Sequence, residues 1–291
     1  MALNAFDYAA PQSVDEALSL LKNGNGKVGI FAGGTDILPQ IKENRRKIDL
    51  LLDIKKLPEA NVLTYDAKNG LRIGSAVSCS DIYSHPDVRT HYPALVDCAS
   101  LIGSVQIQNR STIGGNMCNA SPAGDSPPAL IVLEAVCEVI GPKGKRDIAA
   151  EKFFVSPGRS ALEAGELLLA IRVPAPKAHS GAFSLRFIPR NEMDIAVANA
   201  AVSLVLNGNT ITSARVAIGA VAPTPLLVAA AGAALAGQKI SDEVIEKACA
   251  ASRAAAKPIT DMRGTIEQRV HLAGILTKRA ILGAIERAKE S

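Results

Sequence analysis

The chain has 291 residues, of which 48% are apolar and 21% charged, and its formal net charge is +4. This length predicts two or three packed units, and the composition is that of a globular protein. Lys and Arg are scattered and only 3% of residues are aromatic, with no Trp, which argues against a nucleic-acid partner.

The N-terminal sequence MALNAFDYAAPQSVDEAL has neither the basic run nor the apolar run of a secretory signal. No stretch of about 18 apolar residues lacks a charge or a Gly or Pro break, so no membrane span is expected. The cysteines are widely spaced, without a C-x-x-C pair, which predicts reduced, buried thiols in a cytoplasmic protein and no iron–sulfur or zinc site in this chain. They are Cys79, Cys98, Cys118, Cys137 and Cys249.

The first predicted unit alternates helix and strand. Ser13 and Glu16 form a capping box that begins a helix, and the sequence NGNG at residues 23–26 ends it. A buried strand is predicted over residues 27–32, a helix over 36–44 and a second strand over 50–54. The turn at Gly33 and Gly34 follows the first strand at its carboxyl end, where ligands of α/β sheets tend to bind.

A second unit is predicted from about residue 61. It has strands at residues 70–74, 135–140 and 167–173, and helices at 78–83, 92–102 and 129–134. Residues 103–128 are rich in Gly, Ser, Asn and Pro, and we expect a long functional loop there. The sequence PAPK at residues 174–177 indicates a linker.

The third unit is predicted to combine antiparallel strands with helices. The strands are expected at residues 182–189, 200–206 and 211–219, with a hairpin turn at NGN, residues 207–209. Helices are expected at residues 226–235, 242–256 and 266–290. No internal repeat is evident, and the predicted fold class is α+β.

Gly33 and Gly34 are followed by Thr35 and Asp36. Glycine tolerates positive φ and lets a ligand approach the backbone, and successive N–H groups in such a turn form an anion-binding concavity. A pyrophosphate can be held in this way without a lysine. The alternative is a tight strand-to-helix turn capped by Asp36, and these residues alone leave both open.

A second glycine pair, Gly114 and Gly115, lies in the sequence TIGGNMCNASPAGD at residues 112–125. We predict a polar loop whose Asn and Ser side chains bind phosphate or sugar oxygens. Asp125 precedes a helix that begins with prolines. It is either the N-cap of that helix or a carboxylate that accepts from a ribose or adenine group.

Several common sites are absent from the sequence. Neither glycine pair fits GxGxxG or GxxxxGK followed by Ser or Thr, so a Rossmann site and a P-loop are not supported. The histidines are dispersed, and neither GxSxG nor HExxH occurs. If the chain takes part in a reaction, a cofactor must therefore carry the chemistry.

Three segments carry a family resemblance. AGGTD at residues 32–36, with TIGGN at 112–116 and NASPAGD at 119–125, resembles the FAD-binding medium subunit of molybdenum hydroxylases. That family comprises the xanthine dehydrogenase and carbon monoxide dehydrogenase flavoproteins, and RFIPRNEMDIA at residues 186–196 is similar to its RxxxDIA strand. The resemblance covers nearly the whole chain. No cysteine-rich insertion is evident, which disfavours the subfamily that reduces aromatic acyl-CoA.

The resemblance implies a two-lobed FAD-binding domain of the vanillyl-alcohol-oxidase (PCMH) type over residues 1–176, with lobes of about 1–57 and 58–176. A C-terminal domain of antiparallel sheet and helices follows at residues 177–291. FAD is the implied cofactor. The implied cofactor-binding residues are Ile30, Phe31, Ala32, Gly33, Gly34, Thr35, Asp36, Ile37, Ile102, Gly103, Thr112, Gly115, Asn116, Asn119, Asp125, Leu168 and Arg186.

The resemblance also assigns these residues to parts of FAD. Residues 30–37 would wrap the pyrophosphate together with residues of the 112–119 segment, and Asp125 would bind the adenosine end. Ile102 and Gly103 would lie against the isoalloxazine ring, and Leu168 and Arg186 would also contact the flavin. Arg186 occupies a position often held by Lys.

The implied function is an electron-transfer subunit of an oxidoreductase. A substrate would be hydroxylated at a molybdenum cofactor in a large partner subunit, and electrons would pass through two [2Fe–2S] clusters in a small one. FAD in this chain would pass them to NAD or another acceptor, in a dimer of heterotrimers. Two alternatives stay open: a self-sufficient flavin oxidase, in which Cys118 could tether the flavin, and a scaffold whose glycine pairs are only turns.

Overall fold

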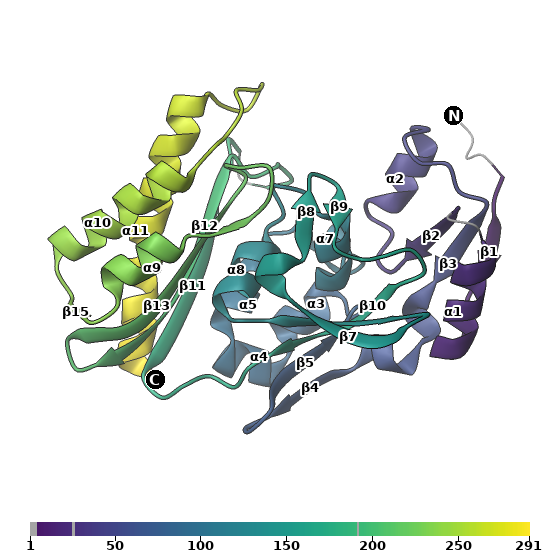
Figure 1. Ribbon diagram of the computed structural model, residues 1–291, viewed down its shortest axis with the longest axis horizontal. Helices are drawn as coiled ribbons and strands as arrows, with labels where there is room; N and C mark the ends of the chain where they lie inside the picture. Colours follow the sequence, from purple (N-terminus) through teal and green to yellow (C-terminus); the bar gives the residue numbers. More distant parts are fainter. Residues whose placement is uncertain (1–4, 25–26, 191) are drawn as a thin grey trace.

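The computed structural model describes residues 5–24, 27–190 and 192–291. Three units lie side by side, with the middle unit between the N-terminal and C-terminal ones (Figure 1). The predicted α+β class is confirmed, with two lobes first and an antiparallel sheet with helices last.

The first unit is a parallel sheet of three strands in the order β1-β3-β2. Ser13 is the predicted N-cap, and its hydroxyl accepts from the Glu16 N–H. The reciprocal bond of the capping box is displaced by one residue, because the Glu16 carboxylate accepts from the Gln12 N–H and not from that of Ser13. The helix ends at Asn23 with Gly24 as its C-cap, within the predicted stop at residues 23–26, of which residues 25–26 lie outside the described residues. The elements are β1 Asp7–Ala9, α1 Val14–Asn23, β2 Val28–Phe31, α2 Ile37–Lys42, β3 Leu50–Asp53 and the 3₁₀ helices Ile54–Lys56 and Pro58–Asn61.

The middle unit is an antiparallel sheet in the order β4-β5-β10-β6-β7, covered by helices. Its strands are β4 Leu63–Asp66, β5 Gly70–Gly74, β6 Val136–Gly141, β7 Gly144–Ala149, β8 Phe154–Ser156, β9 Arg159–Ser160 and β10 Leu167–Val173. Its helices are α3 Cys79–Ser84, α4 Pro86–His91, α5 Pro93–Ala99, α6 Val105–Gln108, α7 Ile113–Asn119, α8 Ser126–Val132 and the 3₁₀ helix Ala150–Lys152. The predicted single loop over residues 103–128 is wrong, because α6 and α7 lie within it.

The C-terminal unit is an antiparallel sheet in the order β11-β12-β13-β14, with β15 paired to β13. Helix α11 packs along β11 and β12, and α10 packs on α11. The helix predicted over residues 226–235 begins later, after the short strand β14. The elements are β11 Ser180–Phe187, β12 Ala198–Asn207, β13 Thr210–Gly219, β14 Leu226–Leu227, α9 Ala229–Leu235, β15 Gln238–Lys239, α10 Asp242–Ala255 and α11 Ile266–Glu290.

Three arginines of the C-terminal unit form ion pairs with carboxylates of the middle unit. They are Arg186 to Asp125, Arg215 to Glu151 and Arg287 to Asp97. The Arg287 guanidinium binds both carboxylate oxygens of Asp97, at 2.6 and 2.8 Å. Such paired geometry fixes orientation as well as distance, so it sets how the two units meet.

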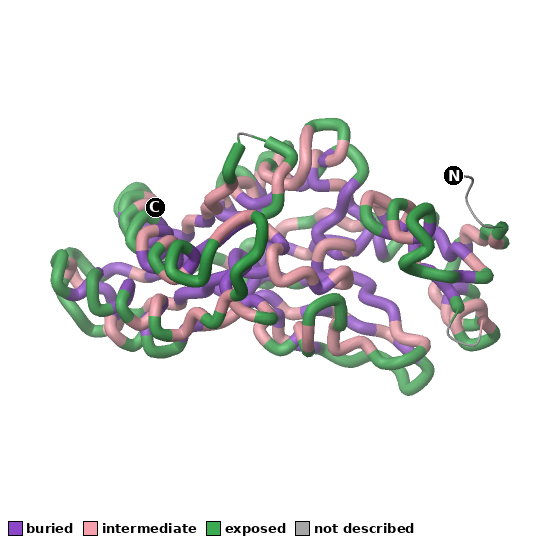
Figure 2. Tube along the Cα trace, turned by 90° about the horizontal axis from the view of Figure 1, so that it is seen from above, coloured by how far each residue is buried: buried purple, intermediate pink, exposed green. Residues whose placement is uncertain are grey.

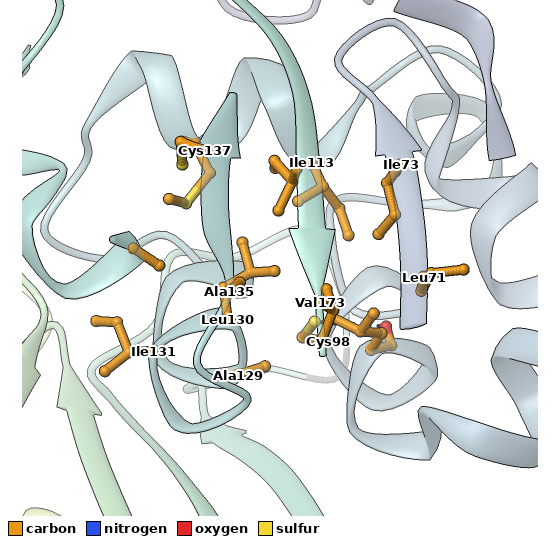
Figure 3. Close-up of a cluster of buried hydrophobic side chains, with 14 of the residues drawn as sticks. Leu71, Ile73, Cys98, Ile113, Ala129, Leu130, Ile131, Ala135, Cys137 and Val173 are labelled. Carbon is orange, nitrogen blue, oxygen red and sulfur yellow. Dashed lines mark hydrogen bonds between the residues drawn. The ribbon is translucent and has the colours of Figure 1, made fainter. Parts of the chain in front are cut away.

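Buried residues run through the interior of all three units, and exposed residues follow the rim (Figure 2). The largest cluster lies between the middle sheet and its helices, and it includes Ile73, Ile113, Leu130 and Cys137 (Figure 3). All five cysteines are free, and each is buried except half-buried Cys118, as expected for reduced thiols. Among the described residues, no helix is both long enough and apolar enough to cross a membrane.

Candidate functional site

One cleft of about 300 Å³ lies between the first and middle units. Its walls come from the loop after β2, from α2, from α7 and the segment before it, and from residues 160–168. Thirteen of the predicted site residues line it: Ile30, Ala32, Gly33, Gly34, Thr35, Asp36, Ile37, Ile102, Thr112, Gly115, Asn116, Asn119 and Leu168. The fold therefore brings both glycine-containing segments to one place, although 77 residues separate Gly33 from Arg110.

The loop after β2 lines this cleft and, within the described part of the chain, has unpaired backbone N–H groups. The N–H groups of Gly33, Gly34, Thr35 and Asp36 have no hydrogen-bond acceptor among the described residues. Gly34 has φ of +83°, a conformation that glycine adopts without strain. Consecutive unpaired N–H groups in a turn attract anions. The loop has the geometry of an anion-binding turn.

This loop touches the second segment directly. A Cβ atom on Gly33 would lie 2.1 Å from the carbonyl oxygen of Arg110, so no side chain fits between the two backbones. Across the cleft, the Gln40 side-chain amide donates to Asn119 Oδ1 at 3.2 Å. The two lobes are joined on both sides of the site.

The second segment is a helix and not the predicted loop. Thr112 is the N-cap of α7, and its hydroxyl accepts from the Gly115 N–H at 2.8 Å. Ile113 and Met117 are fully buried, and Figure 3 shows Ile113 among the core side chains. A Thr before two apolar residues spaced four apart is a helix signal that the glycine and asparagine content obscured.

The two glycines of α7 have different surroundings. A Cβ on Gly114 would lie 2.6 Å from the backbone of Ser75, so Gly114 lets α7 pack against the chain after β5. A Cβ on Gly115 would meet nothing except its own cap, the Thr112 hydroxyl, at 3.0 Å. Because Gly115 lines the cleft, its missing side chain leaves room for a ligand rather than for another part of the chain.

Asn116 caps the next helix in place of Asp125. Asn116 Oδ1 accepts from the Ser126 hydroxyl at 2.7 Å and from the Ser126 N–H at 3.4 Å. Asp125 makes no side-chain capping bond at α8. Asp125 therefore holds the N-cap position of α8, as one alternative predicted, but its side chain does not cap the helix.

Asp125 instead forms a buried ion pair with Arg186, whose Nη1 atom lies 2.6 Å from Asp125 Oδ2. Burial raises the pKa of Asp125 to about 6, and the Arg186 charge opposes that rise. Asp125 Oδ1 and Arg186 Nε have no partner among the described residues. Two groups this close cannot serve opposite ends of one extended cofactor, so the adenosine role for Asp125 and the flavin role for Arg186 cannot both hold.

Two other predicted residues do not line the cleft. The Phe31 ring lies beneath Gly34, where a glycine Cβ would be 2.2 Å from it, and the Lys55 ammonium lies 3.7 Å from the ring centroid. Gly103 packs on Ile107, next to the lining residue Ile102. Gly114 and Cys118 of the second segment also line the cleft. Sequence reasoning missed lining residues that only the fold brings in, with no local motif: Gln40, Arg46, Ile54, Ser75, Ser111, Ser160, Leu162, Glu166 and Leu167.

The site suits an extended, phosphate-bearing cofactor. It combines free backbone N–H groups, the opening at Gly115 and the buried Ser75 hydroxyl, which lacks a partner among the described residues. No histidine lines the cleft, and no metal-binding group of acidic, His and Cys side chains occurs in the described part of the chain. Fold and site together define a two-lobed cofactor-binding protein with an attached C-terminal sheet.

Family comparisons agree with this class. Residues 4–176 match the FAD binding domain in molybdopterin dehydrogenase, and residues 183–284 match the CO dehydrogenase flavoprotein C-terminal domain. The chain belongs to this family of FAD-binding oxidoreductase subunits, which confirms the predicted family and cofactor.

Similar proteins extend over almost the whole chain. The carbon monoxide dehydrogenase medium chain of Hydrogenophaga pseudoflava is 33% identical, covering 96% of each chain. A putative xanthine dehydrogenase FAD-binding subunit of Escherichia coli strain K12 is 30% identical, covering 97% of this chain and 98% of the relative. A structure of carbon monoxide dehydrogenase from H. pseudoflava, lacking the Mo-pyranopterin moiety of its cofactor, superimposes with a TM-score of 0.95 at 34% identity, covering 99% of each chain.

Proposed function

We propose that this chain is the FAD-carrying electron-transfer subunit of a multi-subunit molybdenum hydroxylase. It would accept electrons from [2Fe–2S] clusters of a small partner subunit and pass them to NAD or another acceptor. The observation that carries the proposal is the convergence of the Gly33–Gly34 turn and the Gly115 opening on one cleft. The relatives named above are subunits of enzymes of this kind.

In this proposal the free N–H groups of residues 33–36 bind the pyrophosphate, with Thr112, Gly115, Asn116 and Asn119 on its other side. Ile102 and Leu168 line the same cleft and would contact the flavin. Asp125 and Arg186 do not line this cleft, and we propose that they act as one pair at a single end of the cofactor. We also retain the proposed division into residues 1–57, 58–176 and 177–291.

FAD, when bound, can take up electrons one at a time and release them as a pair. The residues of this chain bind the cofactor, orient it and set the electrostatics around it. No side chain of the cleft needs to act as an acid, base or nucleophile in this role.

The direct test is to purify the chain alone and record its visible spectrum before and after incubation with FAD. We expect a yellow protein, or a colourless one that becomes yellow and retains FAD through gel filtration. A folded, colourless protein that cannot be reconstituted with FAD would end the proposal.

A self-sufficient flavin oxidase is the alternative function, and the presence of a cysteine in the cleft suggests it. Cys118 lines the cleft, but burial raises the pKa of its thiol to about 12, so little thiolate is available to form a flavin tether. We therefore expect acid precipitation to release the flavin into the supernatant. Flavin that stays with the pellet would favour the oxidase.

The proposed partners are a large molybdenum-cofactor subunit and a small [2Fe–2S] subunit, as a dimer of heterotrimers in the cytoplasm. The five free cysteines support a reducing compartment. Affinity purification of the tagged chain from its native host, followed by mass spectrometry and native mass measurement, should recover both partners in equal numbers. Recovery of this chain by itself would contradict that assembly.

A further inference from the structure

Lys55 lies directly behind the anion-binding turn. It belongs to the 3₁₀ helix that follows β3, and β3 pairs in parallel with β2, which leads into the turn. Its ammonium donates to the Ala32 carbonyl oxygen at 3.2 Å and to both Asp53 carboxylate oxygens at 2.8 Å. It also lies over the Phe31 ring, 3.7 Å from the centroid.

Asp53 holds this lysine in place. The Asp53 carboxylate is buried and also accepts from the Tyr8 hydroxyl at 2.7 Å and from the Lys55 N–H at 2.9 Å. Burial by itself would raise the pKa of Asp53, but the bonds from Lys55 and Tyr8 outweigh it and hold that pKa below its ordinary value. Burial lowers the pKa of the Lys55 ammonium, and its bonds to Asp53 oppose that fall.

The position of Lys55 determines where the turn directs its N–H groups. In a planar trans peptide, the Ala32 carbonyl and the Gly33 N–H point in opposite directions. Anchoring the carbonyl from behind therefore turns the Gly33 N–H away from Lys55, and Gly33 lines the cleft. The Lys55 ammonium also lies over the Phe31 ring, and that ring packs against Gly34 of the turn.

We propose that Lys55 is a positioning residue for the cofactor's pyrophosphate. It does not line the cleft, but it holds the backbone whose N–H groups would bind the pyrophosphate. This inference rests on the proposed FAD site. Lys55 lines a separate hollow that Arg110 also lines, so it acts through the backbone that it holds. The turn has no lysine of its own, and Lys55 is supplied by the 3₁₀ helix that follows the neighbouring strand β3.

The test compares three ligands that share parts of FAD. With the full chain, Lys55→Met should weaken binding of FAD and of ADP about tenfold, and should leave binding of riboflavin, which has no phosphate, unchanged. Lys55→Arg, which keeps a cation able to donate to Ala32, should recover part of the loss. A general loosening of the cleft would instead weaken all three ligands.

Lys27→Met is the matched control. Lys27 pairs with Asp49 at 3.2 Å next to the other ends of the same two strands, where both side chains are exposed. The Lys27→Met variant should bind FAD, ADP and riboflavin with the same affinities as the natural chain. If Lys55→Met does not fold, Lys55→Gln replaces it with the same expectation.

The two proposals fail in different ways. A natural chain that binds neither FAD nor ADP removes the proposed function and this inference with it. A natural chain that binds both, together with a Lys55→Met variant that binds them equally well, overturns the role of Lys55 alone. Equal weakening of FAD and riboflavin also overturns it.

Discussion

The two glycine pairs look alike in sequence but have different roles in the structure. Gly33 and Gly34 must both be glycine because of contacts within the chain. Gly33 lies against the Arg110 backbone, and Gly34 has positive φ and lies against the Phe31 ring. In the second pair, Gly114 is required by the Ser75 backbone, whereas Gly115 opens on the cleft. Three of the four glycines therefore serve packing, and one leaves space for a ligand.

This comparison separates two reasons for placing glycine at a binding site. A turn that exposes its N–H groups must bend sharply and lie against its support, so its glycines are structural even though their N–H groups are functional. A helix that lies along a ligand needs only the absence of a side chain at the contact. Substitutions should therefore affect stability at the first pair and ligand binding at Gly115.

The largest effect is expected for Gly33→Ala. Its Cβ would lie 2.1 Å from the Arg110 oxygen, which is backbone and cannot rotate away, so the two lobes must separate. We expect a loss of about 3 kcal/mol in the free energy of unfolding, measured by urea denaturation of the FAD-free chain, and loss of FAD retention. An unchanged unfolding midpoint would show that the lobes are not in contact there.

The carboxylates that end the two segments also differ, since Asp36 is exposed and Asp125 is buried against Arg186. The pKa of Asp125 is raised to about 6, so its stabilising contribution is complete below about pH 3.8 and is lost as the pH rises through 6. Relative to Asp125→Asn, the natural chain should gain up to about 3 kcal/mol between pH 7 and pH 4. Unfolding free energies that run parallel across this range would contradict the raised pKa.

Gly115→Ala should distinguish the two glycine pairs most clearly, because it should weaken FAD binding more than it lowers the free energy of unfolding. Gly115 lines the cleft, and its added methyl would meet no atom of the described chain except the Thr112 hydroxyl, so we expect FAD to bind about tenfold more weakly, which corresponds to about 1.4 kcal/mol. The free energy of unfolding without FAD should change by less than about 1 kcal/mol, because Ala favours a helix over Gly and offsets strain at the Thr112 cap. Unchanged FAD affinity in a fluorescence titration would contradict the proposal that Gly115 lies against the ligand.

The smallest effect concerns the residues that begin the two helices. Thr112→Ala removes the hydroxyl that accepts from the Gly115 N–H and should cost about 1 kcal/mol, whereas Thr112→Ser should cost less. Asp36→Ala should cost less than about 0.5 kcal/mol, since Asp36 makes no side-chain capping bond at α2. Equal losses at the two positions in thermal denaturation would contradict this difference.

Local chemistry allowed much of the fold to be predicted from sequence. The Ser13 N-cap, the strand before Gly33, the hairpin at residues 207–209 and the helix from Ile266 all follow from patterns within a few residues. Short pairings such as β1 with β3 were missed, because three residues have too little pattern to distinguish a strand from a coil. The sequence predicts a loop in place of helix α7 because the Gly and Asn content obscures the local helix signal of Thr112, Ile113 and Met117.

By itself, the sequence determined the family, the cofactor and the two segments that approach it, because those depend on residue types at local spacing. Only the tertiary structure decided that Asp125 and Arg186 form one pair, that Phe31 faces away from the cleft and that Lys55 holds the turn. It also decided which glycine is open to the ligand. These contacts join residues from different strands and helices, and their distances depend on how the units pack, which no local pattern encodes.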